Sequence, residues 1–143
     1  MRHLSILFPV FALAAWTFVV LALVPIVRVR SVMRREIVAD DFRHGEAAAV
    51  PTHVRIPNRN YMNLLELPLL FYVVCLLLVV TSGASDLAVA LAWAYVALRV
   101  VHSLIHLTYN RVLHRLTAFA LSNAALLSLW LVAAVHVVSN AAV

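Results

Sequence analysis

The sequence predicts an all-α integral membrane protein, a bundle of four transmembrane helices in a single domain of residues 1–143. Hydrophobic residues make up 65% of the chain and charged residues only 12%, and the mean hydropathy is +1.00. The apolar residues also gather into four runs of the length that a helix needs to cross a bilayer. Soluble and disordered chains are excluded, because the first carry more charge and the second are poor in apolar residues.

The first predicted span covers residues 4–27, which carry no charged side chain. Such a run is long enough to cross the hydrocarbon core of a bilayer. A signal peptide is the alternative, because Ala12 and Ala14 resemble a cleavage site. We favour a membrane helix, because the apolar core of a signal peptide is only about 7–15 residues long.

The connection at residues 28–60 is polar and rich in arginine. The chain has 11 basic residues, all of them arginine, and seven lie in this connection. Because basic residues favour the cytoplasmic side of a membrane, we expect this loop to be cytoplasmic and the protein to lie in a plasma (inner) membrane. The net charge of +5 indicates contact with an anionic leaflet and not with nucleic acid, because the arginines flank membrane ends and lysine is absent.

The other three spans are expected at residues 62–81, 87–109 and 116–138. Short connections separate them and predict that consecutive helices are antiparallel neighbours. Gly83 suits the end of one helix, and Ser85 or Asp86 suits the start of the next. Cys75 is the only cysteine, lies within a span and is interpreted as a packing residue.

Charged and polar residues inside the second and third spans carry the functional signal. A charge at the bilayer centre costs about 2.5–3.5 kcal/mol, so its presence needs a reason. At helical spacing, one stripe of the second helix holds Arg59, Asn63 and Glu66. The matching stripe of the third span holds Arg99, His102 and His106. Both stripes lie toward the predicted cytoplasmic end, where we expect a site.

Each of these features also has a simpler interpretation. Glu66 and Arg99 could form a buried ion pair with no further role. Polar stripes could hold helices together in a non-catalytic membrane subunit. His102 and His106 could bind a metal with Glu66, but this spacing alone is weak support and we expect no metal site. Pro68 predicts a local bend in the second span, because it cannot donate to the carbonyl of Leu64.

The residues resemble the family of membrane-associated proteins in eicosanoid and glutathione metabolism, abbreviated MAPEG. The second-span segment from Arg59 to Pro68 looks like the second-helix signature of the family, with arginine, asparagine, glutamate and proline at the matching spacing. The third span and its exit are similar to those of microsomal prostaglandin E synthase, in the residues Arg99, His102, His106, Arg111 and Arg115. The segments Val27–Arg30 and Arg43–Gly45, which include His44, resemble the end of the first helix and the following loop.

The resemblance implies a homotrimer that binds glutathione between adjacent subunits near the cytoplasmic face. It implies that the thiolate of glutathione lies beside Arg115, the expected catalytic residue, and that a hydrophobic electrophile enters from the lipid. The other residues that it places in the site are Arg28, Arg59, Asn63, Glu66, Arg99, His102, His106, Arg111 and Phe119. The implied activity is that of a glutathione transferase or peroxidase.

The chain departs from the prostaglandin synthase at three positions. His106 stands where family enzymes commonly have tyrosine, Met62 where the synthase has an additional arginine, and Leu116 where it has a serine. These departures argue against prostaglandin isomerisation. The resemblance is therefore to a bacterial-type member that is a transferase, a peroxidase or a subunit without activity.

Overall fold

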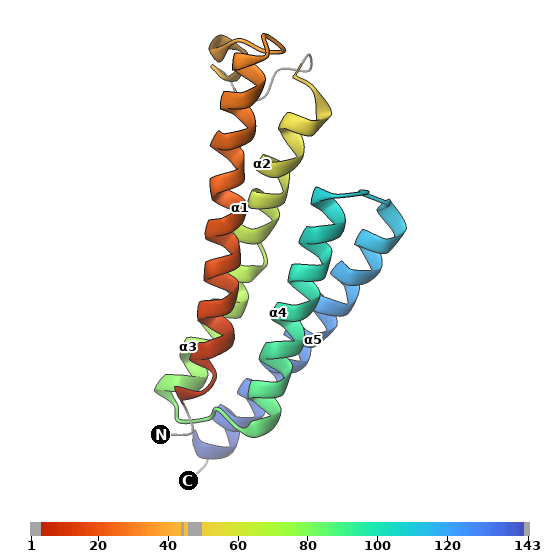
Figure 1. Ribbon diagram of the computed structural model, residues 1–143. Helices are drawn as coiled ribbons and strands as arrows, with labels where there is room; N and C mark the ends of the chain where they lie inside the picture. The colour runs from red at the N-terminus through yellow and green to blue at the C-terminus, as the bar shows by residue number, and fades with distance from the viewer. Residues whose placement is uncertain (1–3, 44, 46–49, 142–143) are drawn as a thin grey trace.

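The computed structural model describes residues 4–43, 45 and 50–141, and in this part of the chain all the regular elements are helices. Figure 1 shows long helices that run up and down the molecule in turn. The helices are α1 (Leu7–Met33), a short 3₁₀ helix (Ala39–Phe42), α2 (Thr52–Leu65), α3 (Pro68–Val80), α4 (Asp86–Leu107) and α5 (Val112–Ala141). No strand occurs among the described residues.

Four helical stretches within the described ranges are long and apolar enough to cross a membrane: α1, α2 together with α3, α4, and α5. The expected number of spans is confirmed. The observed ends differ from the predicted ones most in the second stretch, which begins at Thr52 and not at residue 62, and in α1, which continues to Met33 and is 27 residues long. Both ends of the expected 28–60 connection are therefore helical. At about 1.5 Å per residue this helix is about 40 Å long, so its arginine-rich end projects beyond a hydrocarbon core of about 30 Å. His44 lies outside the described residues.

The second span is broken where the proline predicted a bend. Helix α2 ends at Leu65 and α3 begins at Pro68, and Glu66 has a non-helical ψ of −87°. Pro68 has no N–H to donate to the carbonyl of Leu64, so the ladder of hydrogen bonds stops and restarts with bonds from Leu69 to Glu66 and from Leu70 to Leu67. The break leaves the Glu66 side chain exposed.

The connection between α3 and α4 corrects one expectation about Gly83. The residue with a left-handed backbone is Ser82, with φ of 55°, and not the glycine. Gly83 instead makes room for His136 of α5, whose ring carbon Cδ2 would lie 2.3 Å from a Cβ added at this position. His136 Nε2 donates to the carbonyl of Thr81 at 3.0 Å. Ser85 caps α4 as expected, accepting from Ala88 N–H at 3.2 Å.

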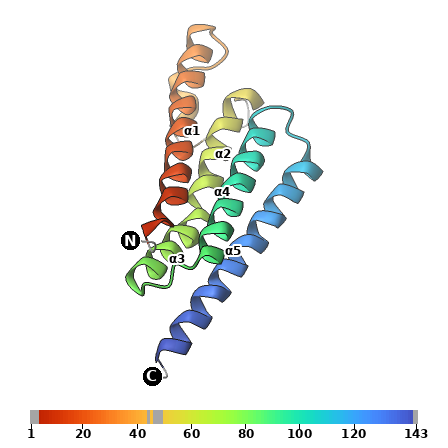
Figure 2. The same cartoon turned by 60° about the horizontal axis from the view of Figure 1, so that its bottom comes forward.

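Helices α4 and α5 form an antiparallel hairpin, and α1 packs beside α2 and α4 (Figures 1 and 2). Buried apolar side chains of α1, α3, α4 and α5, together with Leu64 of α2, make one core. At its centre the rings of Phe71 and Tyr95 stack with centroids 4.7 Å apart. This core joins the helices at the end of the bundle where Figure 1 shows the two termini.

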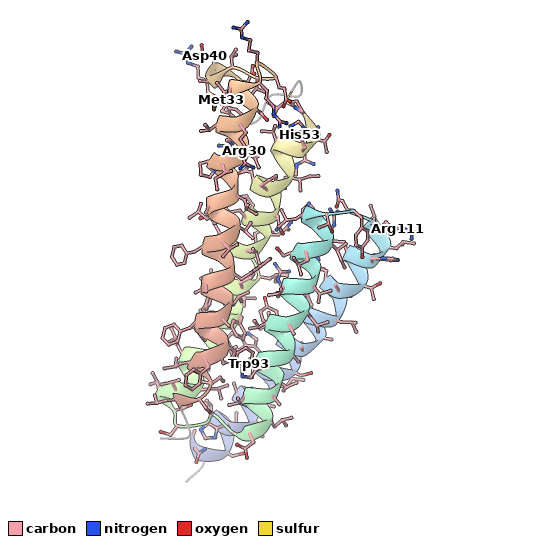
Figure 3. The ribbon with its side chains drawn as sticks, viewed as in Figure 1. Arg30, Met33, Asp40, His53, Trp93 and Arg111 are labelled. Atoms are coloured by element: carbon pink, nitrogen blue, oxygen red, sulfur yellow. The ribbon has the colours of Figure 1, made fainter. Side chains whose placement is uncertain are left out.

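A second, smaller cluster lies at the arginine-rich end and holds the 3₁₀ helix against α1 and α2. Ile37, Val50 and Val54 are its buried members. His53 Nε2 lies 3.0 Å from Glu36 Oε2, and the Arg28 guanidinium lies 4.4 Å from the centroid of the Phe42 ring. Figure 3 shows Arg30, Asp40 and His53 gathered at this end. These contacts order the part of the 28–60 connection that the structure describes.

A buried polar contact joins three helices beside the core. The Ser103 hydroxyl of α4 accepts from the Trp16 indole of α1 at 2.9 Å and from the Asn60 side-chain amide of α2 at 2.6 Å. Both Ser103 and Asn60 are fully buried. Donors buried here cannot form hydrogen bonds to water instead. The hydroxyl therefore fixes the distance between α2 and α4.

Replacing Ser103 by alanine is expected to destabilise the protein by about 2 kcal/mol, because a buried amide donor and a partly buried indole donor lose their acceptor. Thermal unfolding in detergent measures this as a lower melting temperature. The matched control is Ser128→Ala, because the Ser128 hydroxyl bonds to the Ala124 carbonyl one turn earlier in its own helix and so joins no second helix. Equal melting temperatures for the two variants would contradict a joining role for Ser103.

Candidate functional site

A cleft of about 540 Å³ lies between α2 on one side and α4 with α5 on the other. Its volume is in the range of small-molecule sites, about 300–1,000 Å³. Polar side chains line much of it: Thr52, Asn58, Arg59, Asn63, Glu66, His102, His106, Asn110 and Arg115. The apolar lining consists of Ile56, Met62, Val112, Leu116 and Phe119. The two stripes that the sequence predicts on different helices therefore face one cavity.

The α2 wall presents Arg59, Asn63 and Glu66 on successive turns, as their spacing predicts. Arg59 and Glu66 are exposed, and Asn63 is partly buried. The carbonyl of Asn63 accepts a hydrogen bond from Nη2 of Arg99 on α4. The wall therefore offers a cation and a carboxylate to a ligand, about 10 Å apart along the helix axis.

On the α4 wall, the orientation of His102 follows from one hydrogen bond. Its Nδ1 lies 3.0 Å from the main-chain carbonyl of Arg115. A carbonyl can only accept, so Nδ1 carries the proton and Nε2 of the neutral ring is left as an acceptor. Nε2 of His102 and Nδ1 of His106 are both buried without a partner among the described residues. The two rings lie 6.1 Å apart and both line the cleft.

The α5 wall brings Arg115 and Phe119 to the cleft from successive turns of the helix. Nη1 of Arg115 donates to Oδ1 of Asn110 at 2.8 Å. The centroid of the Phe119 ring lies 5.7 Å from the centroid of the His102 ring. It also lies 5.7 Å from Cζ of the Arg99 guanidinium. Arg115 is only partly buried, so most of its donors remain available to a ligand.

Arg99 lies behind the cleft and is fully buried. Its Nε and Nη1 have no hydrogen-bond partner among the described residues. Among the described residues Glu66 and Arg99 are not in direct ion-pair contact, and Glu66 is exposed at the helix break. The buried guanidinium adds positive potential behind the cleft.

The structure brings seven of the ten sequence-predicted site residues to the cleft: Arg59, Asn63, Glu66, His102, His106, Arg115 and Phe119. Arg99 is buried behind these residues. Arg28 lies elsewhere, near the end of α1 and against the Phe42 ring. Arg111 is exposed just before α5, at the tip of the α4–α5 hairpin (Figure 3).

Sequence reasoning missed two amide side chains of the cleft, Asn58 and Asn110. Asn58 directly precedes Arg59, and a signal for it was therefore present in the sequence. Asn110 lies in the connection after α4 and has a positive φ of 47°, a conformation for which asparagine is enriched. Asparagine is common in turns for conformational reasons alone. Its presence at this position therefore did not indicate a contact with Arg115 or with a ligand.

The described residues include no group of three or more His, Cys, Asp or Glu side chains that could hold a metal ion. His102 and His106 therefore lack the third ligand that a zinc site requires. The donors of the cleft are arginines, amides and imidazoles, which suit an anionic organic ligand with hydrogen-bonding groups.

Comparison with known proteins identifies the family. Neither the curated proteins nor the solved structures include a match to the chain. The model of the MAPEG family matches residues 6–135, which contain the first three membrane-spanning stretches, most of the fourth and every residue that lines the cleft. This integral membrane protein, with its cleft between α2 and the α4–α5 hairpin, therefore belongs to the MAPEG family.

Proposed function

We propose that the protein is a membrane-bound glutathione transferase or peroxidase that acts on hydrophobic electrophiles. The family is one of membrane proteins in glutathione and eicosanoid metabolism, and its members generally use glutathione. The observation that carries the proposal is the single cleft that holds Arg59, Arg115 and Glu66 together.

The charges of the cleft complement those of glutathione. The tripeptide has two carboxylates and one ammonium group, and the cleft offers two arginines and one glutamate. Arginine binds carboxylates through paired hydrogen bonds, which are stronger than neutral ones and specific in geometry. Asn58 and Asn63 add amide groups that can bond the peptide backbone of the ligand.

We assign to Arg115 the role of stabilising the sulfur of glutathione as a thiolate. A free thiol has a pKa of about 8.5, and a neighbouring cation lowers it by favouring the thiolate. Arg115 lies in the first turn of α5, where the helix dipole adds further positive potential. The thiolate then attacks the electrophilic atom of the second substrate, and the leaving group departs with its electron pair.

The second substrate is proposed to lie against the apolar wall of the cleft. Met62 and Leu116 are 48% and 56% exposed, and Phe119 lies beside them. All three are in helical stretches long enough to span the membrane. A hydrophobic molecule dissolved in the bilayer therefore reaches this wall without crossing water.

We further propose a homotrimer whose 28–60 loop is cytoplasmic. The arginines at the end of α1 support the orientation, because basic residues accumulate on the cytoplasmic side. In such a trimer the Arg28 side chain, which lies outside the cleft of its own subunit, belongs to a neighbouring cleft.

Heating the purified protein with and without glutathione tests the proposal. Millimolar glutathione is expected to raise the melting temperature, whereas an equimolar mixture of its constituent amino acids has no effect, because only the tripeptide links the charges. Conjugation of glutathione to chlorodinitrobenzene then tests for the transferase. An unchanged melting temperature together with no conjugation would favour the other hypothesis, a non-catalytic membrane subunit whose polar stripes hold helices together.

A further inference from the structure

We propose that Asn110 is a positioning residue for Arg115, and that it orients the guanidinium toward the sulfur without neutralising its charge. The inference rests on the proposed function, in which Arg115 stabilises the thiolate. Its basis is the 2.8 Å hydrogen bond from Nη1 of Arg115 to Oδ1 of Asn110, between two residues that both line the cleft.

The backbone of Asn110 is held firmly enough to orient another side chain. Its φ of 47° lies in the left-handed region, which asparagine adopts more readily than most residues. Its N–H donates to the carbonyl of Ile105 at 2.8 Å, which ties the turn to the last part of α4. The side-chain oxygen of Asn110 therefore starts from a fixed position relative to the α4 wall.

The position of Arg115 at the start of α5 explains why its guanidinium needs a hydrogen-bond acceptor. The first turn of α5 contains no acidic residue, and the dipole of the helix opposes a cation there. Arg115 forms no ion pair in the described chain. A hydrogen bond from the positively charged donor to a neutral amide fixes its direction.

A neutral acceptor suits the proposed chemistry better than a carboxylate. A carboxylate beside Arg115 would offset the positive charge that lowers the pKa of the thiol, whereas an amide leaves that charge intact. The main chain of Arg115 is fixed separately, because its carbonyl accepts from His102 at 3.0 Å. The α4 helix and its turn thus hold Arg115 at two points, one on the backbone and one on the guanidinium.

The first experiment uses the ligand-free protein, so it does not depend on glutathione. Asn110→Gly removes the acceptor while keeping a residue that accepts the left-handed backbone. We expect it to lower the melting temperature by about 2–4 °C in the wild-type background, and to have little effect in an Arg115→Ala background, because the pair is then already broken. Equal shifts in both backgrounds would overturn the pairing of the two side chains.

The second experiment measures the ultraviolet absorbance of the thiolate of bound glutathione against pH. We expect its midpoint to rise by about one pH unit in Asn110→Gly, where orientation is lost, and also in Asn110→Asp, where orientation is kept but the charge is offset. A purely structural role predicts no rise in Asn110→Asp, and that result would overturn the inference. Absence of a thiolate in the wild type would instead contradict the proposed function, and the melting experiment would still decide the pairing.

Discussion

Replacing Arg115 by alanine is expected to lower kcat/KM for conjugation of glutathione to chlorodinitrobenzene by a factor of about 100–1,000 and to abolish the thiolate absorbance. The magnitude is that of removing one group that stabilises developing or formed negative charge in a catalytic site. Arg115 faces the cleft from the first turn of α5, so its loss removes the cation assigned to the sulfur. Steady-state kinetics and difference absorbance at several pH values measure both effects.

Two further variants sharpen this experiment. Arg115→Lys keeps a positive charge but loses the planar fork, and we expect intermediate activity. Arg34→Ala removes an arginine from the exposed end of α1 and is expected to leave the kinetics unchanged. If Arg115→Ala kept wild-type conjugation while Arg34→Ala did not, the assignment of the sulfur to Arg115 would be wrong.

Replacing Gly83 by alanine is expected to destabilise the protein by about 3 kcal/mol. The added Cβ would lie 2.3 Å from Cδ2 and 2.6 Å from Nε2 of His136. The imidazole must therefore move and give up its 3.0 Å hydrogen bond to the carbonyl of Thr81. Overpacking costs about 1–3 kcal/mol and the lost hydrogen bond adds about 1 kcal/mol. A lower melting temperature in detergent measures the loss.

A double variant separates the steric clash from other effects of alanine at this position. His136→Ala alone loses the hydrogen bonds of the ring to the Thr81 carbonyl and the Asn140 side chain and is expected to be mildly destabilising. Adding Gly83→Ala to it should then cost little, because the ring that caused the clash is gone. A Gly83→Ala protein that melts with the wild type would show that the turn can shift freely and that His136 does not restrict it.

The membrane architecture could be predicted from the sequence because its signal is long and redundant. Each span rests on about 20 apolar residues, so single exceptions such as Arg99 do not hide it. The polar stripes could also be predicted, because the helical repeat fixes which side chains share a face. Arg59, Asn63 and Glu66 do line one wall of the cleft.

Contacts between elements could not be predicted from periodicity. The spacing of Glu66 and Arg99 allowed an ion pair, but the helix break at Pro68 leaves Glu66 exposed and the Asn63 carbonyl accepts from Arg99 instead. The bond between Asn110 and Arg115 depends on the conformation of a turn, which hydropathy does not report. The expected site roles of Arg28 and Arg111 stay predictions, because neither residue lines the cleft.

The wall of Met62, Leu116 and Phe119 has a consequence for how the rate of the proposed reaction depends on its surroundings. A peptide substrate arrives from the aqueous phase, whereas an oily one arrives from the acyl chains, so the two meet at a phase boundary. Partitioning, and not solubility in water, then sets the local concentration of the oily reactant. Turnover at a fixed total amount of that reactant should consequently fall as detergent or lipid is added, by simple dilution within the apolar phase.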